Sequence, residues 1–149
     1  TLDDGLTKPI YSSMTNSGDE LRIAAEQIIS TNQKDTALIK SAILRIFSES
    51  GSNIFLTSEV ALINNGEKSL TLSKNVILKT SDKMEITAPK IFISLDKTLI
   101  QADGPIKGFF GASNIEAGKL DIFKENNSAN LVISFTKGAK MVYDVNRSF

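Results

Sequence analysis

The residue pairs with the clearest chemical potential are two Ser-x-x-Lys spacings, Ser94-Lys97 and Ser134-Lys137. In serine acyl-enzymes this spacing brings a lysine amine beside a nucleophilic serine hydroxyl, and the serine begins a helix. In both copies here the serine lies in an expected strand and the lysine in an expected turn. We therefore expect solvated turn lysines rather than a serine nucleophile.

Paired carboxylates are the second candidate for chemistry. Asp3-Asp4 and Asp19-Glu20 lie in expected turns, where Asp is common because its side chain hydrogen-bonds the local backbone. The sequence contains no histidine, cysteine or tryptophan. This excludes Ser-His-Asp and Cys-His sites and nearly every zinc site. We expect that the protein is not an enzyme and uses no cofactor and no metal.

The composition is that of one globular domain. The chain has 149 residues, of which 41% are hydrophobic, and it has no apolar run near the ~20 residues of a membrane span. Lys+Arg and Asp+Glu both number 17 and are scattered, which argues against nucleic acid as a partner. We expect a single domain over residues 1–149, with frayed ends at 1–8 and 144–149. Because the chain starts at Thr1, we also expect a leader or anchor before it.

The stretch from Met84 to Phe110 carries the strongest strand signal. Apolar and polar residues alternate on both sides of Pro89, which predicts a strand with a bend or bulge at a sheet edge, since proline cannot donate to a ladder. Asp96-Lys97 predicts a turn, Thr98–Ala102 a returning strand, and Asp103-Gly104-Pro105 a second turn. Two strands and two turns make one unit.

The remaining strands follow from the same alternation. Between them, residues 19–48 are ambiguous: Ser17 to Glu20 fits a helix capping box, and apolar residues at helical spacing offer a helical hairpin with its turn at Asn32–Asp35. The β-branched content and the alternation Leu21-Ile23-Ala25 stand against helices, but local rules do not decide between the two, and the internal repeat described next favours strands. The expected strands elsewhere are Pro9–Thr15, Ile54–Ile63, Ser69–Ser73, Val76–Thr80, Leu120–Phe123, Leu131–Phe135 and Met141–Tyr143.

The units repeat along the chain. Outgoing strands carry a small residue at positions 25, 58, 88 and 117. The pattern of the returning strands is interrupted at a short residue, namely Ser41, Asn75, Gly104 and Gly138. Both series step by about thirty residues, the range of stacked repeat architectures. A strand pair with one apolar face cannot bury that face alone, so the units must stack or fold over one another.

One apolar face of each strand forms a continuous stripe. It has many Ile and Leu residues and few large aromatic side chains, which suits an ordinary β-sandwich core and also suits a trough for a lipid chain. A groove would leave several inward isoleucines accessible to solvent, whereas a closed core would bury them. The stripe comprises Ile23, Ile46, Leu56, Leu78, Ile86, Ile93, Ile106, Ile115, Ile122, Ile133, Phe135, Met141 and Tyr143.

Four strings give the sequence a family resemblance. They are "LRIAAEQI", "NVILKTSDKMEITAPKIFISLDKTLIQADGPIKG", "GASNIEAGKLDIF" and "LVISFTKGAKMVY". With them the chain resembles, over nearly its whole length, the periplasmic domain of the LptC family of lipopolysaccharide export proteins. The resemblance implies an all-β fold, an open antiparallel jelly roll or β-taco of folded-over strand repeats, in which residues 19–48 are strands. It also implies a location in the periplasm, behind an inner-membrane anchor.

The resemblance implies a transport function without catalysis. The interior would bind the acyl chains of lipopolysaccharide and pass them from an inner-membrane ABC transporter, similar to LptBFG and reached through the N-terminal edge, to a bridge protein similar to LptA. That bridge protein would extend the C-terminal edge strand by β-augmentation, at Leu131, Val132, Ile133, Met141, Val142 and Tyr143. In the same interpretation Lys124 is an exposed lysine outside the groove. The alternative function is a structural or adhesive β-repeat binding domain with a closed core.

The lipid-contact residues carry over from the resemblance only as alternating interior positions. They are Ile46, Leu56, Leu78, Ile86, Ile93, Ile106, Ile115, Ile122, Ile133, Phe135, Met141 and Tyr143.

Overall fold

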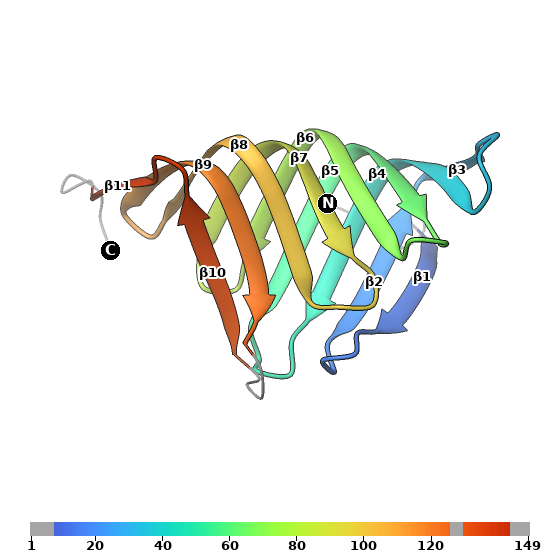
Figure 1. The fold of residues 1–149 in the computed structure, drawn as a ribbon, viewed down its shortest axis with the longest axis horizontal. Helices are drawn as coiled ribbons and strands as arrows, with labels where there is room; N and C mark the ends of the chain where they lie inside the picture. The colour runs from blue at the N-terminus through green and yellow to red at the C-terminus, as the bar shows by residue number, and fades with distance from the viewer. Residues whose placement is uncertain (1–7, 126–129, 144–149) are drawn as a thin grey trace.

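The computed structural model describes residues 8–125 and 130–143, and for residues 8–10 and 141–143 it describes the backbone alone. The expected frayed ends therefore lie mostly outside the described residues. The described chain is all-β (Figure 1). Its strands are β1 (Lys8–Met14), β2 (Glu20–Ala25), β3 (Gln27–Ser30), β4 (Thr36–Phe47), β5 (Asn53–Asn64), β6 (Ser69–Thr80), β7 (Met84–Ser94), β8 (Leu99–Phe110), β9 (Ser113–Lys124), β10 (Leu131–Thr136) and β11 (Lys140–Tyr143).

The strands form one antiparallel sheet in sequence order. Its order is β1-β2-β4-β5-β6-β7-β8-β9-β10, while β3 pairs with β4 and β11 with β9. The sheet does not close on itself in the described residues, because β1 and β10 are the ends of this order. The expected open antiparallel jelly roll is confirmed.

A line of irregular positions crosses the middle of the long strands. The register shifts between Thr57 and Val60, Ser73 and Val76, Thr87 and Lys90, and Asp103 and Ile106. A β-bulge bends a strand and increases its local twist. Bulges aligned across neighbouring strands therefore fold the whole sheet along one line, which we call the crease.

The crease divides the sheet into two walls that face each other (Figure 1). The strand ends opposite the crease, with their turns, form the mouth. Wall A contains β1, β2, residues 42–47, 53–58, 76–80, 84–88, 106–110 and 113–117, and β11; wall B contains β3, residues 36–40, 60–64, 69–73, 90–94, 99–103 and 119–124, and β10.

The repeat found in the sequence is the repeat of the crease. One repeat is a pair of strands that crosses the crease twice. The outgoing strand crosses it at a small residue, and the returning strand crosses it at the short residue that interrupts its pattern. Ser41, Asn75 and Gly138 have positive φ angles of 55°, 53° and 79°, a conformation that bends the strand out of its regular course. The spacing of about thirty residues is thus confirmed as one outgoing and one returning strand.

Residues 19–48 form strands, and the helical hairpin is wrong for them. Local apolar spacing supports both structures, but β4 is paired along its length with β5 on one side and with β2 and β3 on the other. These pairings bury alternate residues such as Leu44 and Ile46. Tertiary pairing outweighs the local helical preference here. The turn at Asn32–Asp35 is common to both interpretations.

Two turn and edge assignments also need correction. Pro89 does not lie at a sheet edge, because β7 is paired with β6 and β8. Proline is tolerated there because it occupies the bulge between Thr87 and Lys90, where the ladder is already interrupted. Asp103-Gly104-Pro105 is likewise a bulge inside β8, with a cis Gly104-Pro105 bond, and not a turn. Bulges and turns share the same residue types, which explains the confusion.

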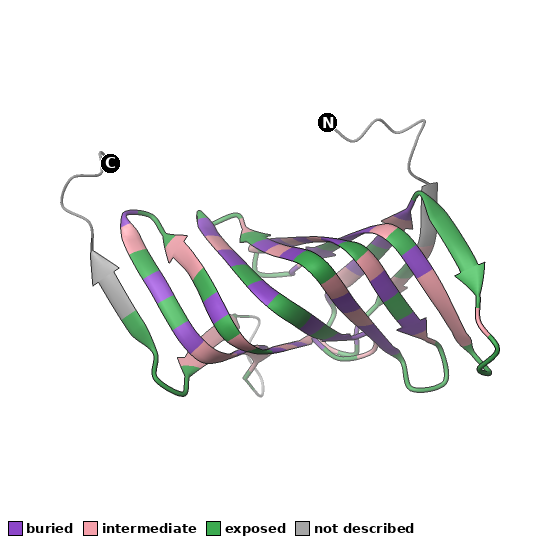
Figure 2. Ribbon diagram, turned by 90° about the horizontal axis from the view of Figure 1, so that it is seen from above, coloured by how far each residue is buried: buried purple, intermediate pink, exposed green. Residues whose placement is uncertain are grey.

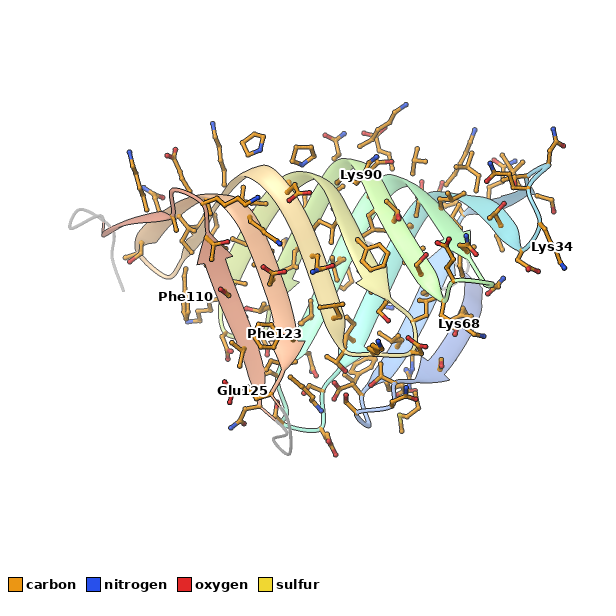
Figure 3. The ribbon with its side chains drawn as sticks, in the orientation of Figure 1. Lys34, Lys68, Lys90, Phe110, Phe123 and Glu125 are labelled. Carbon is orange, nitrogen blue, oxygen red and sulfur yellow. The ribbon has the colours of Figure 1, made fainter. Side chains whose placement is uncertain are left out.

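The alternation of the strands separates an inner from an outer surface. Figure 2 shows buried and exposed residues alternating along each strand. Charged residues such as Lys34, Lys68 and Lys90 extend into solvent (Figure 3). In the part of the chain that the structure describes, no helix is long and apolar enough to cross a membrane.

Candidate functional site

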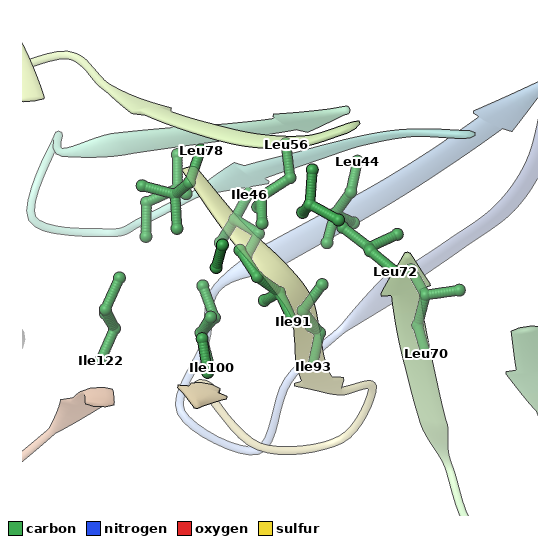
Figure 4. Close-up of a cluster of buried hydrophobic side chains, with 14 of the residues drawn as sticks. Leu44, Ile46, Leu56, Leu70, Leu72, Leu78, Ile91, Ile93, Ile100 and Ile122 are labelled. Atoms are coloured by element: carbon green, nitrogen blue, oxygen red, sulfur yellow. The ribbon is translucent and has the colours of Figure 1, made fainter. Parts of the chain in front are cut away.

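The interior between the walls is lined by aliphatic side chains. Leu44, Ile46, Leu56 and Leu78 of wall A face Leu70, Ile93 and other side chains of wall B (Figure 4). Eight of the predicted interior residues are at most 2% exposed, which is the burial of a closed core: Ile46, Leu56, Leu78, Ile86, Ile93, Ile106, Ile115 and Ile122. At these eight positions the solvent accessibility expected of an empty groove is therefore not found.

The interior becomes more accessible toward β10. Ile133 and Phe135 are half-buried and pack against the core cluster. Their register partners on β9, Ile122 and Leu120, are fully buried, so all four lie on the inner surface. Leu131 packs against the same cluster and is not among the predicted interior residues. The side chains of Met141, Val142 and Tyr143 lie outside the described residues, although their backbone pairs with β9.

The last two strands divide between the walls. β10 pairs with residues 119–124 and β11 with residues 113–116, on opposite sides of the crease. The connection passes close over Gly118, whose N–H donates to the Lys137 carbonyl at 3.0 Å. A Cβ at Gly118 would lie 2.6 Å from that carbonyl oxygen, so only glycine permits this approach. The C-terminal side of the sheet thus presents β10 on wall B and β11 on wall A.

A buried polar cluster joins the two walls at the mouth. We call it the clasp; it comprises Thr15, Asp19 and Glu49 of wall A's turns and Thr98 and Lys124 of wall B. The Asp19 carboxylate is fully buried and lies 2.8 Å from the Lys124 Nζ, whose side chain is 5% exposed. The Thr98 hydroxyl donates to the other oxygen of Asp19 and lies 3.0 Å from the Thr15 hydroxyl.

Backbone groups complete the clasp. The Asn16 N–H donates to the Asp96 carbonyl at 2.7 Å, which links the β1–β2 turn directly to the β7–β8 turn. Lys124 donates to the Ser17 carbonyl at 3.1 Å and to the Glu49 carboxylate at 3.2 Å. The Glu49 N–H donates to Asp19 at 3.1 Å. The buried charges therefore have several partners, as burial of an ion pair requires.

The clasp shifts the pKa values of its two buried charged groups in opposite directions. Burial alone raises the pKa of Asp19, but hydrogen bonds from Lys124, Thr98 and the Glu49 backbone outweigh it, so this pKa lies below its ordinary value of 3.8. Burial alone lowers the pKa of Lys124, but its bonds to Asp19 and Glu49 raise it above its ordinary value of 10.5. Both groups are thus held in their charged forms.

The decisive comparison is with protein families. The sequence matches the family described as "LptC: Lipopolysaccharide-assembly, LptC-related" over residues 7–138, which is most of the chain. The chain belongs to the LptC family. A search of curated proteins gave no match.

Membership of the LptC family gives the general role of the chain. It takes part in lipopolysaccharide transport, as a transport or binding component of the kind that the family comprises. The periplasmic domain of this family lies in the periplasm, and the open β fold agrees with the family. The predicted resemblance is therefore confirmed.

Within the LptC-family fold, the first Ser-x-x-Lys spacing has a structural role. The Ser94 hydroxyl donates to the Asp96 carboxylate at 2.9 Å and accepts the Lys97 N–H at 3.1 Å, so it stabilises the β7–β8 turn. In the second copy, Ser134 is in β10 and Lys137 is at the crease. Among the described residues no group of three or more His, Cys, Asp or Glu side chains is placed to hold a metal.

The clasp is the part of the molecule that sequence reasoning misses. The local pattern predicts an exposed Lys124, but its side chain is buried. The Asp19 side chain is expected from the sequence only to stabilise a turn, but it also forms bonds between the two walls. Asp19 does follow a turn, but its side chain reaches Thr98, which is 79 positions away in the sequence. No local pattern connects residues at such a separation.

Polar and aromatic side chains of the two walls border hollows on the surface. One, of about 380 Å³, lies on the outer face of wall A beside Arg45, Phe47, Phe55 and Lys79. The Arg45 guanidinium lies 5.4 Å from the Phe55 ring centre, a cation–π contact on the solvent side of the sheet. A second hollow, of about 360 Å³, lies on wall B beside the crease. The lining of the first hollow also includes Ile46 and Ile54, which are both 2% exposed and belong to the aliphatic cluster.

Proposed function

We propose that this domain binds the acyl chains of lipopolysaccharide between walls A and B and passes them along the periplasm. The observation that carries the proposal is the inner surface: two aliphatic walls, continuous from β2 to β10, in a sheet that stays open along its sides. A lipid chain needs a long apolar surface with an accessible end, and this arrangement offers one. Family membership supports the same conclusion.

An acyl chain would replace contacts between the two walls rather than fill a cavity that is already empty. Leu78 and Ile93 are now buried within the aliphatic cluster. A hydrocarbon chain between the walls would keep both residues away from water. Burial of aliphatic surface contributes about 25 cal/mol per Å² of free energy. This contribution does not depend on the direction of the contact, so a lipid chain can cover the surface as well as a side chain does. Exchange of wall–wall contacts for wall–lipid contacts therefore costs little, provided that the walls can separate.

The two sides of the sheet would receive and deliver the lipid. In this proposal β1 and β3 face a transporter of the LptBFG type, with the domain held at the inner membrane. β10 and β11 would dock a bridge protein of the LptA type through their unpaired backbone groups. Because the strands lie on opposite walls, a docked sheet could continue both of them.

Photocrosslinking tests the lipid contact. A photoreactive phenylalanine analogue at Ile133 or Phe135 should form adducts with lipopolysaccharide in cells, because these half-buried side chains face the interior. Ser134 is the matched control: it lies between them on the same strand and pairs with Asp121 on the opposite face. Equal labelling at Ser134, or no labelling at the two inward positions in folded protein, would contradict the proposal.

The burial of the interior favours a second function, a binding domain with a permanently closed core. The near-zero exposure of Leu56, Leu78 and Ile86 is what such a core would have. In that case the partner would contact the outer faces or edge strands, and lipid adducts would be absent from every inward position. The crosslinking experiment thus separates the two functions.

A further inference from the structure

We propose that the clasp is a reversible latch on the mouth, and that an acyl chain enters the interior only when Asp19 releases Thr98 and Lys124. The proposal rests on the lipid-binding function above. It adds that the walls must part at the mouth before a lipid received on the β1 and β3 side can place its acyl chains between them, and it names the residues that control this opening. The observations that support it are the position of the clasp, its chemistry and its separation from the apolar lining.

The clasp joins the two walls at the mouth, far from the crease. Asp19 immediately precedes β2 of wall A, whereas Thr98 precedes β8 and Lys124 ends β9, both in wall B. The Asn16 N–H bond to the Asp96 carbonyl spans the same gap. These contacts join the walls at the side farthest from the crease, so their loss lets the walls rotate apart about the crease.

The clasp is polar and charged, whereas the other contacts between the walls are aliphatic. The walls also meet through aliphatic contacts, which a lipid chain can replace without loss of burial. It cannot replace the bonds of Asp19 or Lys124, since it has no polar groups along its length. The buried ion pair must therefore break and become hydrated before the mouth opens, and this makes it the controlling step.

The separation of the clasp from the interior makes a clean test. Clasp residues are turn or strand-end residues, and a substitution there leaves the aliphatic lining unchanged. Asp19→Asn keeps the shape of the side chain but removes the charge, and it replaces one of the two acceptor oxygens with an amide NH2 group that cannot accept a hydrogen bond. Glu20→Gln is the matched control, because the neighbouring Glu20 forms only an exposed pair with Arg22, at 3.0 Å.

Amide hydrogen exchange on the lipid-free protein tests the latch itself. In Asp19→Asn the Asn16 amide, which bridges the walls, should exchange at least tenfold faster than in the wild type. Amides in the middle of β5 and β6 should be unchanged, and Glu20→Gln should match the wild type. If protection at Asn16 and in β5 and β6 falls together, the mouth opens only on global unfolding and the latch is ruled out.

A disulfide across the clasp tests its role in lipid entry. The Thr15 and Thr98 hydroxyls are 3.0 Å apart, and the chain has no cysteine of its own, so Thr15→Cys with Thr98→Cys gives one defined pair. With purified lipopolysaccharide and a photoreactive group at Phe135, the oxidised protein should form adducts at least tenfold more slowly than the reduced protein. Equal rates would overturn the latch.

The two failures are distinguishable. If wild type, reduced and oxidised proteins all give no adducts, the lipid-binding function fails, and the latch has no role in lipid entry. If adducts form at the same rate whether the disulfide is closed or open, lipid binding stands and the latch fails. Adducts that depend on reduction support both proposals.

Discussion

The crease and the mouth hold the same two walls together in different ways. At the crease the walls are joined by continuous backbone, strand after strand, with bulges and left-handed residues such as Ser41 and Asn75 that set the bend. At the mouth they are joined by a few side chains and turns centred on Asp19. One junction is permanent, and the other depends on charge and hydration. The walls can therefore rotate about the crease when the clasp at the mouth is broken. We expect mutations at the crease and at the mouth to have different effects on stability.

The largest effect should come from the interior, which both junctions enclose. Leu78→Ala removes a fully buried side chain at the centre of the cluster and should lower the free energy of unfolding by about 2–5 kcal/mol. Denaturant unfolding followed by circular dichroism measures this. Thr71→Ala, on the outer face of the same strand, should change it by less than about 0.5 kcal/mol. A small effect of Leu78→Ala would mean that the interior is less tightly packed than its burial indicates.

The next largest effect should come from the crease. Gly104→Ala would place a Cβ 2.8 Å from the Ala117 carbonyl oxygen and 2.9 Å from the Gly118 Cα, and these backbone atoms cannot move independently. We expect a loss of about 2–3 kcal/mol of global stability, as for other overpacked sites. Gly51→Ala provides a contrast in the same unfolding measurement, since no atom lies within 4 Å of the position that its Cβ would take, although its φ of 92° adds some strain. Equal losses for the two variants would contradict the close approach at the crease.

The clasp should show a smaller effect on global stability than a buried ion pair usually does. Removing one partner of a fully buried pair costs about 3–5 kcal/mol when the other charge stays buried. Lys124→Met should cost only about 1–2 kcal/mol, because opening of the mouth returns Asp19 to water. Denaturant unfolding measures the loss. A loss at the level of about 3–5 kcal/mol would show that the mouth does not open in the folded state.

The smallest effect should be the response of the clasp to pH. The lowered pKa of Asp19 means that its contribution is present above 3.8 and is lost as the pH falls through the still lower folded-state value. The raised pKa of Lys124 means that its contribution is present below 10.5 and is lost as the pH rises through the still higher folded-state value. Fluorescence of a dye pair on the β1–β2 and β7–β8 turns should show a constant separation between these limits. A change in separation near neutral pH would contradict this assignment.

The parts of the fold that arise from local alternation can be predicted from the sequence. Ile86, Ile91 and Ile93 identify their strand by alternation alone, and the thirty-residue step of small residues locates the crease. The bulge at Pro89 is harder to place within the sheet, because a proline and a ladder interruption have the same local signature at an edge and in the centre. Residues 19–48 cannot be decided locally, since their pairing partners lie on neighbouring strands.

The clasp is beyond local reasoning for a different reason. Asp19 and Lys124 are ordinary surface residue types in the sequence, and each becomes unusual only when folding brings the two together. Ser17 and Lys124 are separated by 107 positions. The interior positions can be predicted because each one obeys the alternation of its own strand. A contact between two distant turns obeys no such rule.

The strand order has a consequence for how the protein folds. Each long strand pairs with the next one along the chain, so the sheet can grow from any single hairpin by short loop closures, which cost little entropy. The clasp contacts between the two walls join residues 75 to 107 positions apart and need most of the sheet in place. We therefore expect the Asn16 amide to gain protection last during refolding, in a step separate from that of β4 to β9. Pulse-labelling hydrogen exchange can order the two steps, and early protection of Asn16 would refute this sequence of events.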